Sequence, residues 1–166
     1  TEKALLKPAS ILARPQGPQV SLVQLALEHL EPYLEMLSVP ESMALTGTTK
    51  TFTRDEIIHW LSTRAQTANR RDWAIVDESG EFCGEVVLNE FDDAKNQMNL
   101  RICLRGPDYF SRGIGRQAIA LALETAFDTL SLDKVTLEVL VNNPRAIASY
   151  TAVGFVPGRQ FNEKTL

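Results

Sequence analysis

Two glycines stand one residue apart, at Gly113 and Gly115, directly before a segment with helical periodicity. Glycine permits backbone turns that other residues avoid, and it lets a ligand approach the chain closely. The first turn of a helix exposes free backbone N–H groups and the positive end of the helix dipole, which together suit an anion such as a phosphate. Arg112 and Arg116 add positive charge on either side. The pattern indicates a phosphate-binding turn, although a plain turn before a helix has the same glycine spacing.

The best-known nucleotide-binding loops do not fit this segment. Ala118 stands where a dinucleotide-binding fingerprint would place its third glycine, and no lysine follows as it does in a P-loop. Nucleotide binding of these two types is therefore disfavoured.

Periodicity and turn residues predict the elements that must position this turn. Strands are expected at Val20 to Ala26, Trp73 to Val76, Phe82 to Asn89, Gln97 to Leu104 and Lys134 to Val141. Helices are expected at Pro32 to Leu37, at Thr53 to Ala68 with Thr53 and Glu56 as a capping box, at about Gly113 to Thr129, and from Pro144 to just before Gly154. The glycine turn therefore joins an antiparallel strand to a long helix.

Length and composition limit the classes of function. A chain of 166 residues with 44% hydrophobic residues is the size of one domain with a single core. Its formal net charge of -4 argues against a surface that neutralises nucleic-acid phosphates. No apolar run reaches the roughly 20 residues that span a bilayer, and the first residues lack a signal-peptide pattern. We therefore expect a cytoplasmic protein with neither nucleic acid nor membrane as a partner.

The two cysteines, Cys83 and Cys103, lie in apolar segments that read as strands. Their spacing is not that of metal ligands. Buried, reduced thiols are predicted, and no metal site is expected.

Longer motifs extend the glycine turn on both sides. The stretch "SRGIGRQA" (111–118) leads into the helix, and "LEVLVNNPRAIASYTAVGF" (137–155) follows it, with "GEVVLNEFD" (84–92) and "MNLRICL" (98–104) upstream. On these motifs the chain, from about Val20 to Phe155, resembles the GNAT superfamily of acyl-CoA-dependent N-acetyltransferases, and most closely its RimJ/RimL-like subgroup.

The resemblance implies a fold and a co-substrate. The expected fold is α/β of the α+β type, a mixed and mostly antiparallel sheet flanked by helices. The sheet should open near the end of the Gln97 to Leu104 strand, where acetyl-CoA enters. Residues 1–19 would then be an N-terminal extension, and residues 20–166 the acetyltransferase domain.

The family's loop motif, Q/R-x-x-G-x-G/A, falls on Phe110 to Gly115, and Phe110 departs from it. Because this family holds the pyrophosphate mainly by backbone N–H groups, we expect the change to weaken a supporting contact and to leave the cradle intact. The strand before the loop should pair with the pantetheine arm. Asn143 should border the same cleft and Arg145 should reach a CoA phosphate, unless they are a strand-end turn residue and a solvated arginine. The implied CoA-binding residues are Ile102, Cys103, Leu104, Phe110, Ser111, Arg112, Gly113, Ile114, Gly115, Arg116, Asn143 and Arg145.

Tyr150 matches the family tyrosine that protonates the departing CoA thiolate. A phenol with a pKa of about 10 can donate a proton to a thiolate as the tetrahedral intermediate collapses. Spacing alone puts Tyr150 on one helix face with Ala146, Ile147 and Val153, so a core role is the alternative.

The general base is left open by the sequence. The subgroup often carries a glutamate on the strand before the loop, where this chain has Asn99, and an asparagine cannot accept a proton at neutral pH. Deprotonation of the acceptor would fall to a bound water, to Glu85 or to Glu138, although both glutamates also read as ordinary strand residues. An acyl-enzyme on Cys103 is a disfavoured further route.

The predicted reaction is direct transfer of an acetyl group from acetyl-CoA to an amine. The subgroup suggests a protein N-terminal α-amine, small-molecule amines use similar scaffolds, and the acidic charge balance favours a cationic acceptor. The alternative is a non-catalytic acyl-CoA-binding regulatory module, which Phe110 and Asn99 motivate.

The end of the chain departs from the family pattern. Residues 156–166 are enough for one short strand with a turn at Pro157 and Gly158, whereas the family usually adds a further strand beside the one matching Lys134 to Val141. An open edge on so apolar a strand is costly, so we expect it to recruit a strand. The sources are Ala9 to Ala13 of the extension or, slightly preferred, a second chain in a homodimer. Otherwise the tail itself pairs with that strand in a smaller sheet.

Overall fold

A single seven-stranded sheet organises the computed structural model, which describes residues 2–6, 19–40 and 51–160. The strand order is β2-β3-β4-β5-β6-β1-β7. The strands are β1 (Glu2–Leu6), β2 (Val20–Gln24), β3 (Arg71–Asp77), β4 (Phe82–Asp92), β5 (Gln97–Leu104), β6 (Lys134–Val139) and β7 (Val156–Gln160). Neighbouring strands are antiparallel except β5 and β6, which are parallel. The mixed, mostly antiparallel α+β fold expected from the sequence is confirmed.

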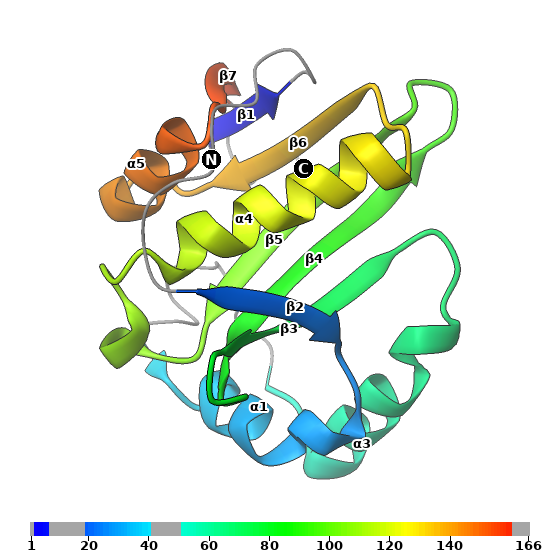
Figure 1. The fold of residues 1–166 in the computed structure, drawn as a ribbon, viewed down its shortest axis with the longest axis vertical. Helices are drawn as coiled ribbons and strands as arrows, with labels where there is room; N and C mark the ends of the chain where they lie inside the picture. Colours follow the sequence, from blue (N-terminus) through cyan, green and yellow to red (C-terminus); the bar gives the residue numbers. More distant parts are fainter. Residues whose placement is uncertain (1, 7–18, 41–50, 161–166) are drawn as a thin grey trace.

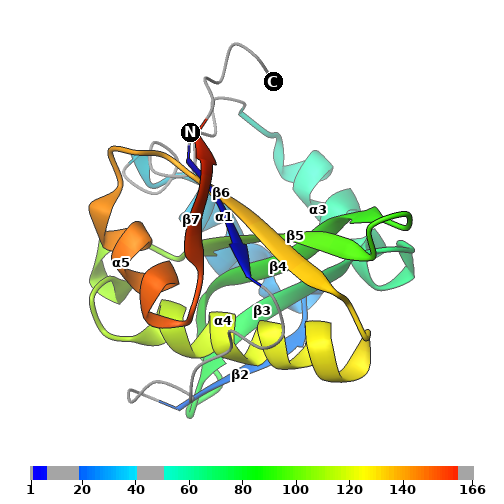
Figure 2. The same cartoon turned by 90° about the horizontal axis from the view of Figure 1, so that it is seen from above.

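Helices cover both faces of this sheet (Figures 1 and 2). They are α1 (Leu30–Leu37), α3 (Arg54–Thr63), α4 (Ile114–Glu124) and α5 (Pro144–Ala152). Figure 2 shows α4 on one side of the central strands and α1 and α3 on the other. A π-helical turn at Thr125–Thr129 continues α4 to the predicted end of that helix. Among the described residues, no helix is long and apolar enough to cross a membrane.

Local hydrogen bonds explain where α3 begins. The Thr53 hydroxyl accepts from the Glu56 backbone N–H at 3.1 Å, and the Glu56 carboxylate accepts from the Thr53 N–H at 3.4 Å. This is the predicted capping box, which satisfies donors that a helix start leaves free. The helix ends at Thr63 and tightens into a 3-10 turn at Arg64–Gln66, before the predicted end at Ala68.

The two faces of the central strands have different chemistry, because side chains alternate along a strand. The α4 face buries apolar side chains, among them Val86, Leu100 and Leu137, against Ile119 and Leu123 of α4. The opposite face has a smaller apolar cluster beneath α1 and α3, formed by Leu25, Tyr33, Met36, Ile57, Leu61, Ala74 and Phe82. The polar residues of the central strands alternate with the apolar α4-face set and so lie on this second face.

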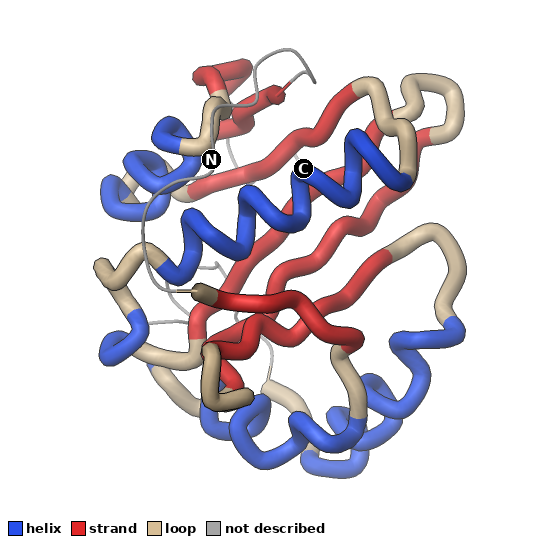
Figure 3. The backbone as a smooth tube through the Cα atoms, in the orientation of Figure 1, coloured by secondary structure: helices blue, strands red, loops and turns tan. Residues whose placement is uncertain are grey.

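The sheet position expected to be unfilled is occupied by β1 (Figure 3). This strand pairs antiparallel with β6, from Glu2 opposite Val139 to Leu6 opposite Val135, and with β7 on its other edge. The extension therefore supplies the strand, but with Glu2–Leu6, and the segment proposed for this role, Ala9 to Ala13, lies outside the described residues. The ground for expecting a strand-sharing homodimer is removed, and β7 does not pair with β6 as the third alternative required.

The predicted turn at Pro157 and Gly158 is wrong, because both residues lie inside β7. In the described sheet, β7 is the last strand in the order and pairs with β1 alone. An edge strand tolerates proline, since the missing N–H can belong to its unpaired side.

Candidate active site

The central opening of the sheet lies between β5 and β6. Their parallel pairing runs from Gln97 opposite Lys134 to Leu100 opposite Leu137 and then stops. Beyond that point β5 stays paired with β4 up to Leu104, and β6 stays paired with β1 up to Val139. Figure 3 shows the two strands diverging. Within the described residues, the direct pairing of these two strands therefore ends here, and Ile102, Cys103 and Leu104 follow on the β5 side.

The loop after β5 leads directly into the N-terminus of α4. Ser111 has a φ of 58°, and Gly113, the N-cap of α4, has a φ of 82°. A residue in the left-handed conformation turns the backbone so that successive N–H groups can point into one concavity. Such a concavity is a common anion-binding arrangement. The predicted turn and helix start are present at this position, with Ile114 as the first helical residue.

Gly115 is not required by the packing of the protein itself. Among the described residues, a Cβ atom at this position would meet only the Ile102 Cδ1 atom, at 3.9 Å, which is ordinary van der Waals contact. Space therefore remains beside the first turn of α4, on the side facing β5.

Arginines surround this loop. Arg145 of α5 stacks over the Phe110 ring, with its guanidinium carbon 3.7 Å from the ring centroid. Arg112 donates to the Asp108 carbonyl at 3.4 Å, and Arg116 is exposed on the first turn of α4. Phe110, which replaces the polar residue of the family motif, thus serves as a platform that holds a cation from α5 against the loop.

Asn143 is the N-cap of α5. Its side-chain oxygen accepts from the Ala146 backbone N–H at 3.3 Å, and the residue is buried. The structure accounts for this asparagine through capping, and contact with CoA remains a prediction.

Tyr150 lies on α5, partly buried against the large core cluster, with its ring 6.2 Å from that of Phe155 in an edge arrangement. Burial, and secondarily the neighbouring Cys103, raise the pKa of Tyr150 to about 12. Its hydroxyl makes no hydrogen bond within the described part of the chain. The phenol therefore remains a proton donor at neutral pH.

Glu85 is buried on β4, opposite Cys103 of β5. The Tyr33 hydroxyl of α1 donates a hydrogen bond of 3.0 Å to its carboxylate. Burial raises the pKa of Glu85, and the positive charge of Arg101 and the Tyr33 hydrogen bond oppose that effect. Sequence reasoning missed Tyr33, because its place on an amphipathic helix face indicates core packing only.

Glu138 differs from Glu85 in its surroundings. It is exposed, and it is the first residue of β6 beyond the pairing with β5. β5 lies between the strands of the two glutamates, so the structure does not join them into one carboxylate pair.

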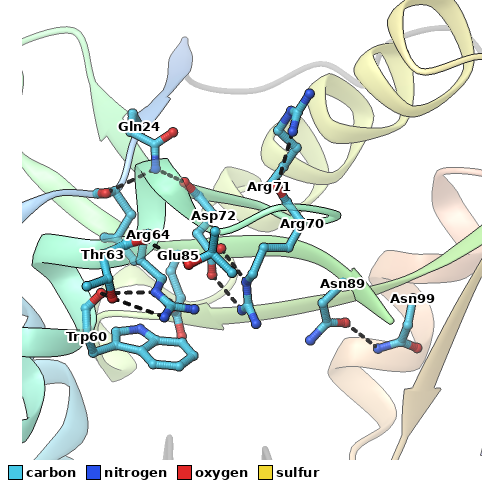
Figure 4. Close-up of polar contacts among 12 residues, drawn as sticks. Gln24, Trp60, Thr63, Arg64, Arg70, Arg71, Asp72, Glu85, Asn89 and Asn99 are labelled. Atoms are coloured by element: carbon cyan, nitrogen blue, oxygen red, sulfur yellow. Dashed lines mark hydrogen bonds and ion pairs between the residues drawn. The ribbon is translucent and has the colours of Figure 1, made fainter. Parts of the chain in front are cut away.

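The other two residues considered for proton or acyl transfer have structural explanations. Burial, and then the charge of Glu85, raise the pKa of Cys103 to about 12, which keeps the thiol protonated and argues against an acyl-cysteine. The Asn99 side chain donates to Asn89 of β4 at 3.4 Å (Figure 4). It also accepts from the Thr136 hydroxyl of β6 at 3.5 Å. Asn99 thus bridges three strands just before β5 and β6 separate.

Comparison with known proteins gives the family. The family model described as "Acetyltransferase (GNAT) domain" matches residues 19–156. The chain belongs to the GNAT acetyltransferase family. The resemblance identified from the sequence motifs is confirmed at this level, and the RimJ/RimL-like subgroup is not specifically shown.

Several spermidine acetyltransferases resemble this GNAT chain. The Vibrio cholerae spermidine N(1)-acetyltransferase is 31% identical over 86 residues, which are 52% of this chain and 49% of that protein. The chain thus spans about half the length of this curated relative. A crystal structure of spermidine N-acetyltransferase from Vibrio cholerae in complex with CoA and spermine has a TM-score of 0.78 at 25% identity and covers 87% of this chain and 85% of that one. A dodecameric structure of the Vibrio cholerae enzyme has a TM-score of 0.70 at 23% identity, covers 86% of this chain and 82% of that one, and supports the fold alone.

Proposed function

We propose that this GNAT chain transfers the acetyl group of acetyl-CoA to a primary amine of a small polycation of the polyamine class. The observation that carries the proposal is the opening between β5 and β6, which leads to the glycine turn at the start of α4. Such an opening offers strand-like hydrogen bonds to a pantetheine amide chain and helix-start N–H groups to a pyrophosphate.

The binding roles follow from this placement. Ile102, Cys103 and Leu104 would bond the pantetheine arm through their backbone, and the Ser111 to Gly115 turn would hold the pyrophosphate. The free space at Gly115 supports close approach of a ligand there. Arg112, Arg116 and Arg145 would add charge-assisted contacts to the phosphates of CoA.

The choice of acceptor rests on charge and on the similar proteins. The chain has a net charge of -4, and the exposed Glu138 is the first residue of β6 beyond the pairing with β5, at the opening. A polyamine is a flexible polycation that such a surface attracts. The similar structure with CoA and spermine holds the same two kinds of ligand. An N-terminal α-amine, which the RimJ/RimL-like subgroup would favour, is the competing acceptor.

Tyr150 would act as the general acid. As the C–S bond of the tetrahedral intermediate breaks, the electron pair passes to sulfur, and the resulting thiolate takes the phenolic proton. The raised pKa of Tyr150 keeps that proton in place until this step.

A thiol-release assay across an amine panel tests the proposal. The panel contains spermidine, spermine, an aminoglycoside and short peptides with free N-termini, each with acetyl-CoA. Release of CoA with polyamines, at a kcat/KM well above that for peptides, is the expected result. Tyr150→Phe should lower kcat by about 10²-fold or more while CoA still raises the melting temperature.

Two results would contradict the proposal. CoA binding with no thiol release for any amine would favour the regulatory module. A Gly113→Val variant that keeps the full CoA-induced rise in melting temperature would exclude the glycine turn as the phosphate site, since the added side chain would occupy the approach to the backbone.

A further inference from the structure

Two buried acidic residues on the second sheet face differ in their hydrogen-bond and ion-pair partners. Asp72 of β3 is fully buried and is held by Arg70 through two hydrogen bonds, at 2.7 and 2.8 Å. Glu85 of β4 is buried to a similar degree, yet within the described residues it has no ion pair and only the Tyr33 hydroxyl as a hydrogen-bond donor. Buried charges in a structural role are normally paired, as Asp72 is. Glu85 departs from this rule.

Two of the cations near Glu85, Arg64 and Arg70, interact with other groups (Figure 4). Arg70 holds Asp72, and Arg64 donates to the Trp60 carbonyl at 3.0 Å while it stacks on the Trp60 ring. Arg101 is exposed on β5 and forms no ion pair with another residue of the described ranges. The groups that act on the Glu85 carboxylate from all sides are Tyr33 of α1, Arg64 after α3, Arg70 and Asp72 at β3, and Arg101 and Cys103 of β5.

The position of Glu85 relates it to the opening. Its partner across the β4–β5 pair is Cys103, and directly opposed side chains of an antiparallel pair have Cβ atoms about 5 Å apart. Cys103 stands on the edge of β5 that β6 has left, and it also acts electrostatically on Tyr150. Cys103 therefore lies between the buried Glu85 carboxylate and both the edge of the opening and Tyr150.

We infer that the Tyr33–Glu85 pair supplies the general base of the reaction. Glu85 accepts the proton of the acceptor ammonium group, and Tyr33 is a positioning residue that fixes the carboxylate. This inference rests on the acetyl transfer proposed above and names a residue, Tyr33, that the family motifs did not indicate.

The proton balance of the reaction is complete with these groups. Glu85 takes one proton from the ammonium, which leaves a neutral amine whose lone pair attacks the thioester carbonyl carbon. When the C–S bond breaks, sulfur takes the Tyr150 proton, and the nitrogen gives its second proton to the Tyr150 phenolate. Glu85 then releases its proton to solvent, so the products are an N-acetylated amine, CoA thiol and one proton.

The test measures kcat/KM against pH, from about pH 5 to pH 10, for the best amine of the panel. The wild type should lose activity at low pH as Glu85 becomes protonated. Glu85→Gln should lower kcat by about 10²- to 10⁴-fold and should remove this acid limb, leaving activity that rises with pH as the amine deprotonates by itself. Glu85→Asp should restore part of the activity.

The pH of the acid limb in Tyr33→Phe distinguishes a positioning role of Tyr33 from a purely structural one. The Tyr33 hydrogen bond favours the charged carboxylate and lowers the pKa of Glu85, so its loss should shift the acid limb to higher pH while much of the maximal kcat remains. The matched control is Tyr109→Phe, which removes the 3.2 Å hydrogen bond from Tyr109 to Glu81 at the surface. This control should leave the pH of the acid limb unchanged.

The CoA-induced rise in melting temperature, measured in every variant, separates folding and donor binding from proton transfer. Two outcomes would overturn the assignment of Glu85 as the base without contradicting acetyl transfer. One is an active Glu85→Gln variant whose kcat/KM still falls at low pH as in the wild type, and the other is a Tyr33→Phe variant whose acid limb stays at the same pH or moves to lower pH. A wild type without turnover on any amine would overturn both.

Discussion

Gly84 is the position at which an added methyl group should do the most damage beside the opening. An alanine Cβ there would lie 2.4 Å from the Cys103 carbonyl oxygen and 2.8 Å from the Leu104 Cα atom. Both atoms belong to the backbone of β5, so no flexible side chain can move aside. The Gly84 φ of 156° is also one that residues with a Cβ rarely adopt.

The cost of Gly84→Ala can be estimated from these two effects. Overpacking against fixed atoms costs about 1–3 kcal/mol, and an unfavourable backbone conformation costs about 1–3 kcal/mol. We expect the free energy of unfolding to fall by about 2–6 kcal/mol, a large part of the stability of an ordinary domain, and the melting temperature to fall by about 4–24 °C. Because the displaced atoms belong to Cys103 and Leu104, CoA affinity should also fall.

Urea unfolding of Gly84→Ala and of a control variant tests this reasoning. The control is Gly106→Ala, where the Cβ would meet, of the part of the chain that the structure describes, only the Val39 Cγ2 atom at 3.7 Å, and where the φ of 174° is extended. That variant should change stability by less than about 1 kcal/mol. Equal stabilities for the two variants would refute the close approach of β4 to β5 at Gly84.

Three further predictions concern single interactions. Asp72→Asn should lower the free energy of unfolding in urea by about 3 kcal/mol or more, because it leaves the largely buried Arg70 guanidinium without its carboxylate. The control is Glu31→Gln, which loses an exposed pair with Arg54 and should show no measurable change in stability. Asn143→Ala should cost about 1 kcal/mol through loss of the α5 cap, and an equal stability in thermal unfolding would contradict that role. Burial raises the pKa of Glu85 in the folded state. The protonated Glu85 side chain therefore stabilises the fold fully below the unfolded-state pKa of about 4.3, and this stabilisation is lost as the pH rises through the folded-state pKa. Glu85→Gln should therefore gain stability relative to the wild type over that pH window, and a constant difference in chemical denaturation at several pH values would count against the raised pKa.

The features predictable from sequence are those that depend on neighbouring residues. The strand Gln97–Leu104 has its predicted bounds, and the capping box of Thr53 and Glu56 forms as expected. The glycine turn also lies at the predicted start of α4, because a positive φ at Gly113 is a local requirement.

The features that the sequence did not reveal depend on residues far apart in the chain. β1 pairs with β6 and β7 across more than a hundred residues, and no local pattern in Glu2–Leu6 specifies those partners. The sequence also ranked Glu85 and Glu138 equally as candidate bases. Burial distinguishes them, and burial is decided by which helix covers each strand, here α1 with Tyr33 over Glu85.

The sheet itself separates the two charged parts of the proposed site. The loop arginines and the first turn of α4 belong to the α4 side, whereas Glu85 belongs to the face beneath α1 and α3. A continuous sheet would separate an acetyl donor on one face from an acceptor on the other. The pairing of β5 and β6 ends after Leu100 and Leu137, and this gap connects the two faces. On the proposed function, the anionic donor and the cationic acceptor therefore approach from opposite faces, and the thioester lies in the gap between the strands. Asn99, bonded to both Asn89 and Thr136, holds the strands together one residue before that gap, so it is expected to set where transfer can occur without taking part in it.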